Sequence, residues 1–328
     1  GANDANLSMF INTENGVTLN GNSTVTAADN KAINGVVHIV DAVIGLPNIV
    51  DHAIANPNLT SLVGALTADN NTTFTTLLAD SENDFTVFAP LNTAFESFTN
   101  PSDNDLNSIL ANHVISGAAA NAESLTNTYF NTAAMNADGD NLSIYVSIDD
   151  GVTLNGTSTV VAADIIATNG IIHAVNTVID LPTVVTFATA DPNFSSLVGA
   201  LTAEGQPDFV SVLSTPNGTD PAPFTVFAPT NGAFANLAEV PSGDALTAVL
   251  NHHVIVGANI VSGDLSNGLI SPATLEGDTL TFTIDGDNNV TITDGSGNSE
   301  IGIIAVDVQA NNGVIHAIDT VMIPDTTN

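Results

Sequence analysis

The sequence predicts an α+β protein built from tandem copies of one unit, in which short helices come first and a twisted antiparallel sheet comes last. The first observation is a phrase, Asn-Gly-x-x-His, that occurs at 34–38, 169–173 and 312–316. Its histidines stand 135 and 143 residues apart, which is the size of an independent domain rather than of a solenoid repeat. The second is a change inside each unit from apolar spacings of three and four to strict alternation.

A second phrase occurs only twice, and it indicates which copies of the unit are complete. Phe-Thr-Val-Phe-Ala-Pro stands at 85–90 and at 224–229, and a Leu-x-x-His-Val phrase follows each copy. Residues 1–47 contain neither phrase. We therefore expect the C-terminal β part of an incomplete unit at 1–47 and complete units at 48–182 and 183–328.

The first complete unit begins with patterns that are typical of short helices. Apolar residues recur at spacings of three and four in three stretches between 49 and 78. The Phe-Thr-Val-Phe phrase alternates as a strand and stops at Pro90. Asn92 is expected to cap the helix that follows, and Asn104 or Asp105 is expected to cap the next one.

The second part of the unit changes to the alternating pattern of strands. Residues 142–148 alternate strictly, and the pair Asn155-Gly156 is the strongest two-residue signal for a hairpin turn. A last strand is predicted at 171–175, and the last unit keeps the same plan with a strand at 280–284. Helices followed by an antiparallel sheet form an α+β arrangement.

The charge of the chain excludes whole classes of partner. The sequence has one Lys, no Arg and 35 acidic residues, and its formal net charge is −34. Such a polyanion repels nucleic-acid backbones and anionic lipid headgroups, which bind proteins through Lys and Arg. We therefore expect no nucleic-acid partner and no binding to anionic membranes. The same repulsion opposes self-association unless salt, divalent cations or a large apolar contact offsets it.

Two interpretations explain the acidity: adaptation to high salt, and an extracellular protein with almost no trypsin sites. Charged residues make up only 11% of the chain, whereas a salt-adapted cytosolic protein is expected to carry far more Asp and Glu, so we favour the extracellular interpretation. Without cysteine the chain has no disulfides and no thiol chemistry. No apolar run reaches the length of about 18 residues that spans a bilayer. The start, Gly-Ala-Asn-Asp, does not resemble a signal peptide, which suggests a mature or excised piece.

Together, the two repeated phrases resemble the fasciclin (FAS1) domain, over the whole of 48–328 and, for the last strands of a further domain, over 1–47. In that family the two phrases lie as neighbouring strands in the core. The resemblance therefore implies that Phe88 and Phe227 are buried beside the strands that carry His173 and His316. The residues that carry the resemblance are Phe88, Pro90, Asn92, His113 and His173 in one copy and Phe227, Pro229, Asn231, His253 and His316 in the other.

The resemblance implies an extracellular adhesion or matrix module, usually arranged in tandem and without catalytic activity. In bacteria and archaea it implies a secreted or surface-attached protein. Animal members carry a Tyr-His pair that is associated with integrin adhesion. The aligned residues here are Asn112-His113 and His252-His253, without a tyrosine, so integrin-type binding is not carried over.

The histidines do not form a pattern typical of a metal site. His38, His173 and His316 each stand alone among apolar residues, so we expect packed rings bonded to the backbone rather than zinc ligands. His252 and His253 are adjacent, and adjacent residues on a helix do not face the same way. We expect no zinc there.

Asp285, Asp287 and Asn289 are weak calcium candidates, because they alternate like the start of a calcium loop. The run does not continue to the bidentate glutamate that an EF-hand requires, so an ordinary hairpin turn is the expected structure. A hydrolase needs a nucleophile, a base and an orienting group held together, and the sequence offers no Gly-x-Ser-x-Gly phrase. We expect no enzymatic activity, no cofactor and no stoichiometric metal.

Two hypotheses follow for function. The first is a structural or adhesive protein whose tandem domains form part of an extracellular matrix, sheath or filament, with other copies or domains of the same array as partners. The second is a surface module that binds a glycan, or a small apolar ligand between the helices and the sheet. The chain has no Trp and only two Tyr, which disfavours sugar binding because sugar platforms usually use these side chains.

Residues 1–47 align with 136–182 and supply late strands without the helices and the strand that cover them in the complete units. A hairpin of this kind is at best marginally stable alone. The favoured explanation is a window cut from a longer array, whose missing part comes before Gly1. The alternatives are a free-standing remnant and strand donation to a neighbouring copy. Mutual completion is disfavoured because each chain has three late parts and only two early ones.

Overall fold

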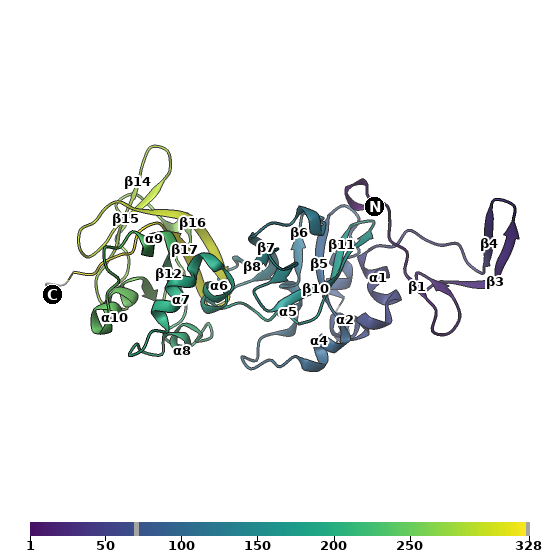
Figure 1. The fold of residues 1–328 in the computed structure, drawn as a ribbon, viewed down its shortest axis with the longest axis horizontal. Helices are drawn as coiled ribbons and strands as arrows, with labels where there is room; N and C mark the ends of the chain where they lie inside the picture. The colour runs from purple at the N-terminus through teal and green to yellow at the C-terminus, as the bar shows by residue number, and fades with distance from the viewer. Residues whose placement is uncertain (69–71, 326–328) are drawn as a thin grey trace. The chain divides into compact units, whose positions relative to one another are not determined.

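The computed structural model describes residues 1–68 and 72–325, and it confirms the α+β class (Figure 1). The chain divides into two compact units. The first contains residues 1–127, 132–134 and 146–180, and the second contains 128–131, 135–145 and 181–328. No helix among the described residues is long and apolar enough to cross a membrane.

The described residues form three sheets. The N-terminal sheet has the order β1-β2-β3-β4, the next has the order β6-β5-β11-β10-β9-β8-β7, and the last has the order β13-β12-β17-β16-β15-β14. The N-terminal strands are β1 (Ile11–Asn12), β2 (Thr18–Leu19), β3 (Ser23–Ala32) and β4 (Gly35–Val40).

The first complete copy contains five short α-helices and seven strands among its described residues. The helices are α1 (Ile49–Ala55), α2 (Thr60–Leu66), α3 (Thr73–Leu77), α4 (Asn92–Ser97) and α5 (Leu106–Ala111). The strands are β5 (Phe85–Pro90), β6 (Val114–Ser116), β7 (Thr128–Met135), β8 (Asn141–Ser147), β9 (Thr153–Leu154), β10 (Ser158–Ala167) and β11 (Gly170–Val175).

The second complete copy repeats this order, with helices before the antiparallel strands. Its helices are α6 (Val184–Ala190), α7 (Ser195–Leu201), α8 (Phe209–Leu213), α9 (Asn231–Ala235) and α10 (Gly243–His252). Its strands are β12 (Phe224–Pro229), β13 (Val254–Val256), β14 (Thr281–Ile284), β15 (Val290–Thr293), β16 (Ile301–Ala310) and β17 (Gly313–Ile318).

The two repeated phrases meet as neighbouring parallel strands in each complete copy. Strand β11 pairs with β5 so that His173 lies opposite Phe88, and β17 pairs with β12 so that His316 lies opposite Phe227. Every residue of these four strands is buried, as expected for parallel strands covered on both faces. Both phenylalanines are fully buried, which confirms the predicted placement.

The part of a copy from its first helix to the loop that follows β6 or β13 is called the early half. The strands from β1 to β4, from β8 to β11 and from β14 to β17, with the residues directly before and after them, are called the late halves. Two of the three late halves share the chemistry of their first turn. Asn155 and Gly156 have φ of 49° and 67° and form the predicted tight turn, and Asn20 and Gly21 repeat it with 49° and 69°.

The prediction that Asn92 caps its helix is wrong. Helix α4 begins one residue earlier than a cap at Asn92 requires, because Leu91 already occupies the extended capping position. The Asn92 side chain instead holds α2, since its Oδ1 accepts from the Ser61 N–H at 2.9 Å and its Nδ2 donates to the Pro57 carbonyl at 2.8 Å. Asn231 makes the equivalent two bonds.

The prediction for the following helix is confirmed for one of its two candidates. Asp105 is the N-cap of α5, and its carboxylate accepts from the Ser108 N–H at 2.9 Å. The Asn104 side chain donates instead to the Asp180 carboxylate at 2.9 Å. A side chain one position before the cap cannot reach the free N–H groups of the first turn as well as the cap itself.

Truncation of the core phenylalanines tests the strand assignment. Phe88→Ala or Phe227→Ala should lower the free energy of unfolding by about 3–5 kcal/mol, as the loss of a fully buried aromatic side chain does. Chemical denaturation of the variants and the unchanged chain measures this. A change below about 1 kcal/mol, outside the range for buried aromatic truncations, would contradict the assignment.

Candidate functional site

The asparagine of the Asn-Gly-x-x-His phrase holds the late half to the early half. Asn169 Nδ2 donates to the carbonyl oxygens of Leu78 and Asp80, both at 2.8 Å, and its Oδ1 accepts from the Ile49 N–H at 3.1 Å. Asn312 makes the three equivalent bonds in the second copy. One buried amide in each copy therefore ties the start of the last strand to the ends of two helical segments.

The glycine of the phrase allows the two parallel strands to approach. A Cβ atom placed on Gly170 would lie 2.2 Å from the carbonyl oxygen of Phe85, and one on Gly313 would lie 2.2 Å from that of Phe224. Real side chains do not tolerate such a distance to backbone atoms. The strand can therefore pair at this position only if the residue is glycine.

The histidine of the phrase completes the contact. The His173 ring stacks on Phe88 with centroids 5.6 Å apart. Its Nε2 donates to the Ala120 carbonyl at 2.9 Å, and its Nδ1 accepts from the Asp164 N–H at 3.3 Å. His316 repeats this arrangement on its own phenylalanine, with centroids 5.5 Å apart. Both rings are neutral in this arrangement, and burial lowers the pKa of each.

The threonine of the Phe-Thr-Val-Phe phrase positions the carbonyl that receives the histidine proton. Thr86 Oγ1 donates to the Ala118 carbonyl and accepts from the Ala120 N–H, both at 2.8 Å. Thr225 makes the same pair of bonds in the second copy. The two phrases are therefore connected by a chain of side-chain bonds as well as by the strand ladder.

A second histidine in each copy is locked in the opposite tautomer. His113 Nδ1 donates to the Ile109 carbonyl at 2.7 Å, and its Nε2 accepts from the Ile179 N–H at 2.9 Å. His253 makes the same bonds to Val249 and Met322. A proton added at Nε2 would face a backbone N–H in a fully buried site, and burial lowers the pKa of both rings to about 4. These histidines serve structure rather than acid–base chemistry.

The residues that precede each complete copy are attached to it by the same side-chain contact. Inside the first compact unit, Ser8 Oγ accepts from the Ile166 N–H at 2.9 Å. Inside the second, Ser143 Oγ accepts from the Gln309 N–H at 3.0 Å. The serines are 135 residues apart and their partners 143, which are the two repeat spacings.

A backbone contact repeats in the same way. The Pro47 carbonyl accepts from the Thr168 N–H at 2.9 Å in the first unit, and the Pro182 carbonyl accepts from the Asn311 N–H at 2.8 Å in the second. Each complete copy thus receives the end of the preceding late half through equivalent atoms. This repetition is the chemical pattern expected of a regular array.

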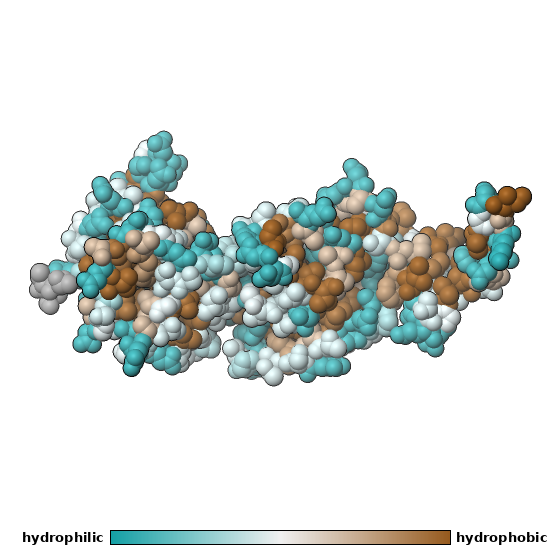
Figure 2. Space-filling view, in the orientation of Figure 1, coloured by the Kyte–Doolittle hydropathy of each residue, from teal (hydrophilic) through white to brown (hydrophobic). Residues whose placement is uncertain are grey.

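The first late half exposes to solvent the strand that, in the complete copies, pairs with the Phe-Thr-Val-Phe strand. Strand β4 is exposed at five of its six positions, whereas all six equivalent positions of β11 are buried. Ile33, Val36, Val37 and Ile39 expose between 52% and 110% of their reference surface. In Figure 1 no helix covers either face of the β3–β4 hairpin among the described residues, and Figure 2 shows hydrophobic residues on its surface.

The prediction of a packed ring is wrong for His38, the third histidine of the phrase. His38 is exposed, and its Nδ1 accepts one long bond, at 3.4 Å from the Asp29 N–H. The phenylalanine and the carbonyl that hold His173 belong to an early half, and residues 1–47 contain none. The same sequence phrase is therefore buried or exposed according to its partner.

Comparison with known proteins decides the family. The Fasciclin domain model matches residues 57–182 and 192–324. The chain belongs to the fasciclin family. Protein sll1483 of Synechocystis is 37% identical over 153 residues, which cover 43% of this chain and 73% of that protein. Human periostin is 28% identical over 283 residues, which cover 81% of this chain but only 32% of periostin.

One solved structure is also similar. The FAS1 domain pair from the insect cell adhesion molecule fasciclin I aligns with 82% of this chain and 97% of its own, with 19% identity and a TM-score of 0.47. The family match over residues 57–182 and 192–324 confirms the resemblance inferred from the two repeated phrases.

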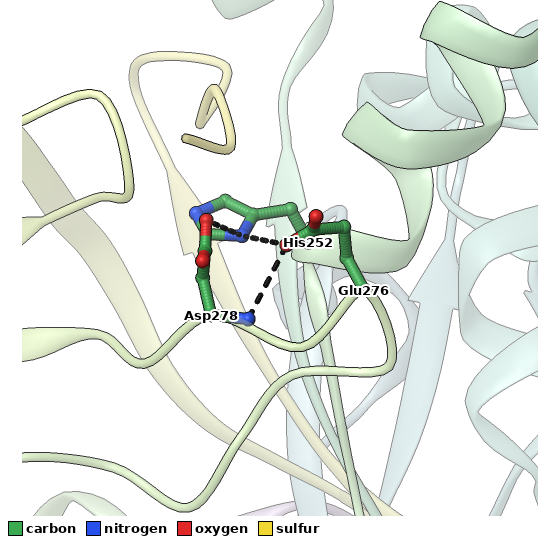
Figure 3. Close-up of side chains that lie close together, drawn as sticks. All are labelled: His252, Glu276 and Asp278. Carbon is green, nitrogen blue, oxygen red and sulfur yellow. Dashed lines mark hydrogen bonds and ion pairs between the residues drawn. The ribbon is translucent and has the colours of Figure 1, made fainter. Parts of the chain in front are cut away.

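One cluster in the second fasciclin domain was not predicted from the sequence. His252 Nδ1 lies 3.5 Å from Glu276 Oε2 and 3.9 Å from Asp278 Oδ2 (Figure 3). The histidine is fully buried, and the two carboxylates are largely buried. Among the described residues it is the one group of three or more ligating side chains close enough to share a metal ion.

The hydrogen bonding of His252 argues against a metal ion in this cluster. Its Nε2 accepts from the Gly295 N–H at 3.2 Å, so the ring proton lies on Nδ1, the atom that faces the carboxylates. Burial lowers the pKa of His252, against the opposing effect of Asp278 and Glu276. A metal ion on Nδ1 would displace this proton to Nε2, where it would meet the Gly295 N–H. His252 and His253 bind different partners, as their adjacency predicted.

The weak calcium candidates lie in a closed turn. The Asp285 carboxylate accepts from the N–H groups of Asp287 and Asn289 at 2.8 and 2.9 Å, and from Asn289 Nδ2 at 2.9 Å. These bonds lower the pKa of Asp285, and the bond from the Asn289 side chain has the largest effect. The carboxylate is directed at its own turn. That neither fasciclin domain binds a stoichiometric metal stays a prediction.

Apolar cavities lie between the helices and the sheet of each fasciclin domain. The first has a volume of about 60 Å³ and is lined by residues such as Leu62, Leu110 and Ile172. Its counterpart beside Leu197 and Ile315 has about 40 Å³. Ligand pockets usually have volumes of roughly 300–1,000 Å³. Both volumes lie well below this range.

The buried histidines predict an acid sensitivity above the range where carboxylates titrate. The pKa of His113 and of His253 is about 4 in the folded chain and 6.5 in the unfolded chain, so the unfolded state binds more protons between these values. The free energy of unfolding should therefore be highest above pH 6.5 and fall as the pH decreases. At pH 5 the free energy of unfolding should be lower than at pH 7 by about 2 kcal/mol for each of these two histidines.

Urea denaturation at pH 7 and pH 5 measures this effect. His173 and His316 act in the same direction, because burial lowers their pKa as well. The variant His113→Gln should be less stable at pH 7 and should lose less stability on acidification than the unchanged chain. Equal free energies of unfolding at the two pH values would contradict the assignment.

Proposed function

We propose that this chain is a non-catalytic structural protein of a cell surface or extracellular matrix, built as a regular array of fasciclin domains. The observation that carries the proposal is the repeated attachment of each complete copy to the preceding late half, through Ser8 and Ser143 and through Pro47 and Pro182. A protein selected for an array needs the same junction at every step. A single binding module does not.

The family and the chemistry of the core support this proposal. Fasciclin domains occur in proteins of the adhesion and matrix class, with which periostin is grouped. Four of the histidines in the two complete domains have both ring nitrogens bonded to the backbone, which leaves neither nitrogen available for acid–base chemistry or metal binding. The net charge of −34 with a single Lys fits an extracellular protein that resists trypsin-like proteases.

The alternative function, a module for a glycan or a small apolar ligand, has less support. The cavities of about 60 and 40 Å³ are too small for an apolar ligand of ordinary size. Sugar platforms usually present Trp or Tyr, and this chain has no Trp and two Tyr. The Tyr129 ring packs against Tyr145 and Phe187, and Tyr145 is buried, so neither ring is free to form a sugar platform.

Sedimentation velocity across ionic strengths tests the proposal. The chain should be monomeric at low salt, because its charge opposes association, and should form larger species as salt screens the charge and the exposed apolar surface becomes adhesive. Val37→Asp should weaken this association. Val161→Asp is the matched control, because Val161 is 53% exposed and Val37 is 56% exposed, but Val161 lies on a covered late half.

A glycan array probed with the same chain tests the alternative function directly. Binding to defined glycans by a chain that stays monomeric at all salt concentrations would overturn the structural proposal and favour the binding module. Association without glycan binding supports the array.

A further inference from the structure

One buried histidine, His252, differs from the four whose ring nitrogens are both bonded to the backbone. Its ring is fully buried, and its Nδ1 has no hydrogen-bond partner among the described residues. Glu276 and Asp278 face this atom from 3.5 and 3.9 Å (Figure 3), which is longer than the roughly 2.7–3.2 Å of an N–H···O bond. A buried donor without a bond costs free energy, so the neutral ring is held in an unfavourable environment.

The other nitrogen of the ring supports the turn between β15 and β16. His252 Nε2 accepts from the Gly295 N–H at 3.2 Å. The same turn holds residues 322–325, which follow β17 and are called the exit segment here. Asp294 Oδ2 accepts from the Ile323 N–H at 2.8 Å, and a backbone N–H of the turn donates to the carbonyl of that residue at 3.0 Å. The ring is therefore connected to the exit segment through the turn.

Close packing joins the turn to the carboxylates as well. A Cβ atom on Gly295 would lie 2.3 Å from Asp278 Oδ2 and 2.5 Å from the backbone nitrogen of Asp325, so the site has no room for one more carbon atom. Asp278 Oδ2 also accepts from the Asp325 N–H at 2.7 Å. The end of α10, the loop before β14, the turn after β15 and the exit segment thus meet at one buried point.

The equivalent position in the first domain holds a residue that does not titrate. Asn112 takes the place of His252, since each directly precedes the histidine of the Leu-x-x-His-Val phrase. The Asn112 Nδ2 donates to the Asp180 carbonyl at 3.0 Å, and Asp180 precedes Ile323 by the repeat spacing of 143 residues. The segment held in this way continues to Pro182, which contacts the second domain. The same task is performed by an amide in one domain and by an imidazole in the other.

We propose that His252 is an acid-operated switch that releases the exit segment of the second fasciclin domain. A second proton, taken from solvent, has to occupy Nε2, the atom at which the Gly295 N–H points. The charged ring then loses its bond to the turn and is drawn to Glu276 and Asp278 through its Nδ1. The turn and the exit segment separate from the end of α10, while the rest of the domain stays folded.

The groups around the ring determine the pH at which the switch operates. Burial has the largest effect and lowers the pKa of His252 below 6.5, whereas Asp278, Glu276 and Asp294 favour the charged ring. The neighbouring His253 is neutral and bonded at both nitrogens, so it adds no charge. The contact with Gly295 is therefore complete above pH 6.5 and is lost as the pH falls through the lower value of the folded chain. Because two carboxylates face His252, it should become charged at a higher pH than His253, whose pKa is about 4.

Nuclear magnetic resonance of the full chain, from pH 7 down to the onset of unfolding, tests the switch. At pH 7 the His252 ring should carry its proton on Nδ1 alone. On acidification both ring nitrogens should become protonated, and the amide signals of Gly295 and Ile323 should shift with the same midpoint. The Asp180 amide of the first domain is the internal control and should not follow this midpoint.

Two variants separate a switch from a merely packed ring. His252→Asn introduces the residue of the first domain, so the Gly295 and Ile323 amides should stay constant over the same pH range. Glu276→Gln keeps the size of the side chain and removes one charge. It should lower the midpoint of His252 by about one pH unit, the lower end of the effect of an opposite charge at this range.

Four results would overturn the proposal. They are a His252 ring that stays neutral until the domain unfolds, a charged ring with no change at Ile323, amide shifts that persist in His252→Asn, and a midpoint that Glu276→Gln leaves unchanged. Coincident titration of the ring and the exit segment, absent in His252→Asn and moved to lower pH in Glu276→Gln, supports it.

Discussion

The parallel pairing of the Phe-Thr-Val-Phe strand with the Asn-Gly-x-x-His strand is the contact on which each fasciclin domain depends. It brings together residues that are far apart in sequence, and it carries a strand ladder, an aromatic–imidazole stack and a buried asparagine that bonds two helical segments. Each residue of the second phrase has a separate physical task, and each task requires the first phrase. The fold is therefore divided chemically into two halves that complete each other.

This division explains the contrast between His173 and His38. The rings have the same sequence context and the same hairpin register. One is fully buried and bonded at both nitrogens, and the other is exposed with a single long bond. In a chain of charge −34, the exposed apolar side chains of β4 are one part of the described surface where apolar contact opposes the charge repulsion.

The sequence predicted what the repeats encode and missed what arises only in three dimensions. Phe88 beside His173 could be predicted because both phrases recur and the family pairs them. The cap at Asn92 could not, because Leu91 takes the extended capping position and the helix begins one residue earlier. Strand β7 was missed because Thr128–Met135 lacks strict alternation, and the His252 cluster was missed because Glu276 and Asp278 lie in a loop of a single copy.

Hydrogen exchange of the three equivalent strands tests the central claim most directly, because Val36–Val40, 171–175 and 314–318 have nearly the same sequence and differ in their partner. If pairing of the two halves stabilises each domain, the amides of β11 and β17 should exchange only through unfolding of their domain, and those of β4 at the open edge should exchange as fast as in an unfolded peptide. Equal protection of β4 and β11 in the isolated chain would contradict the account.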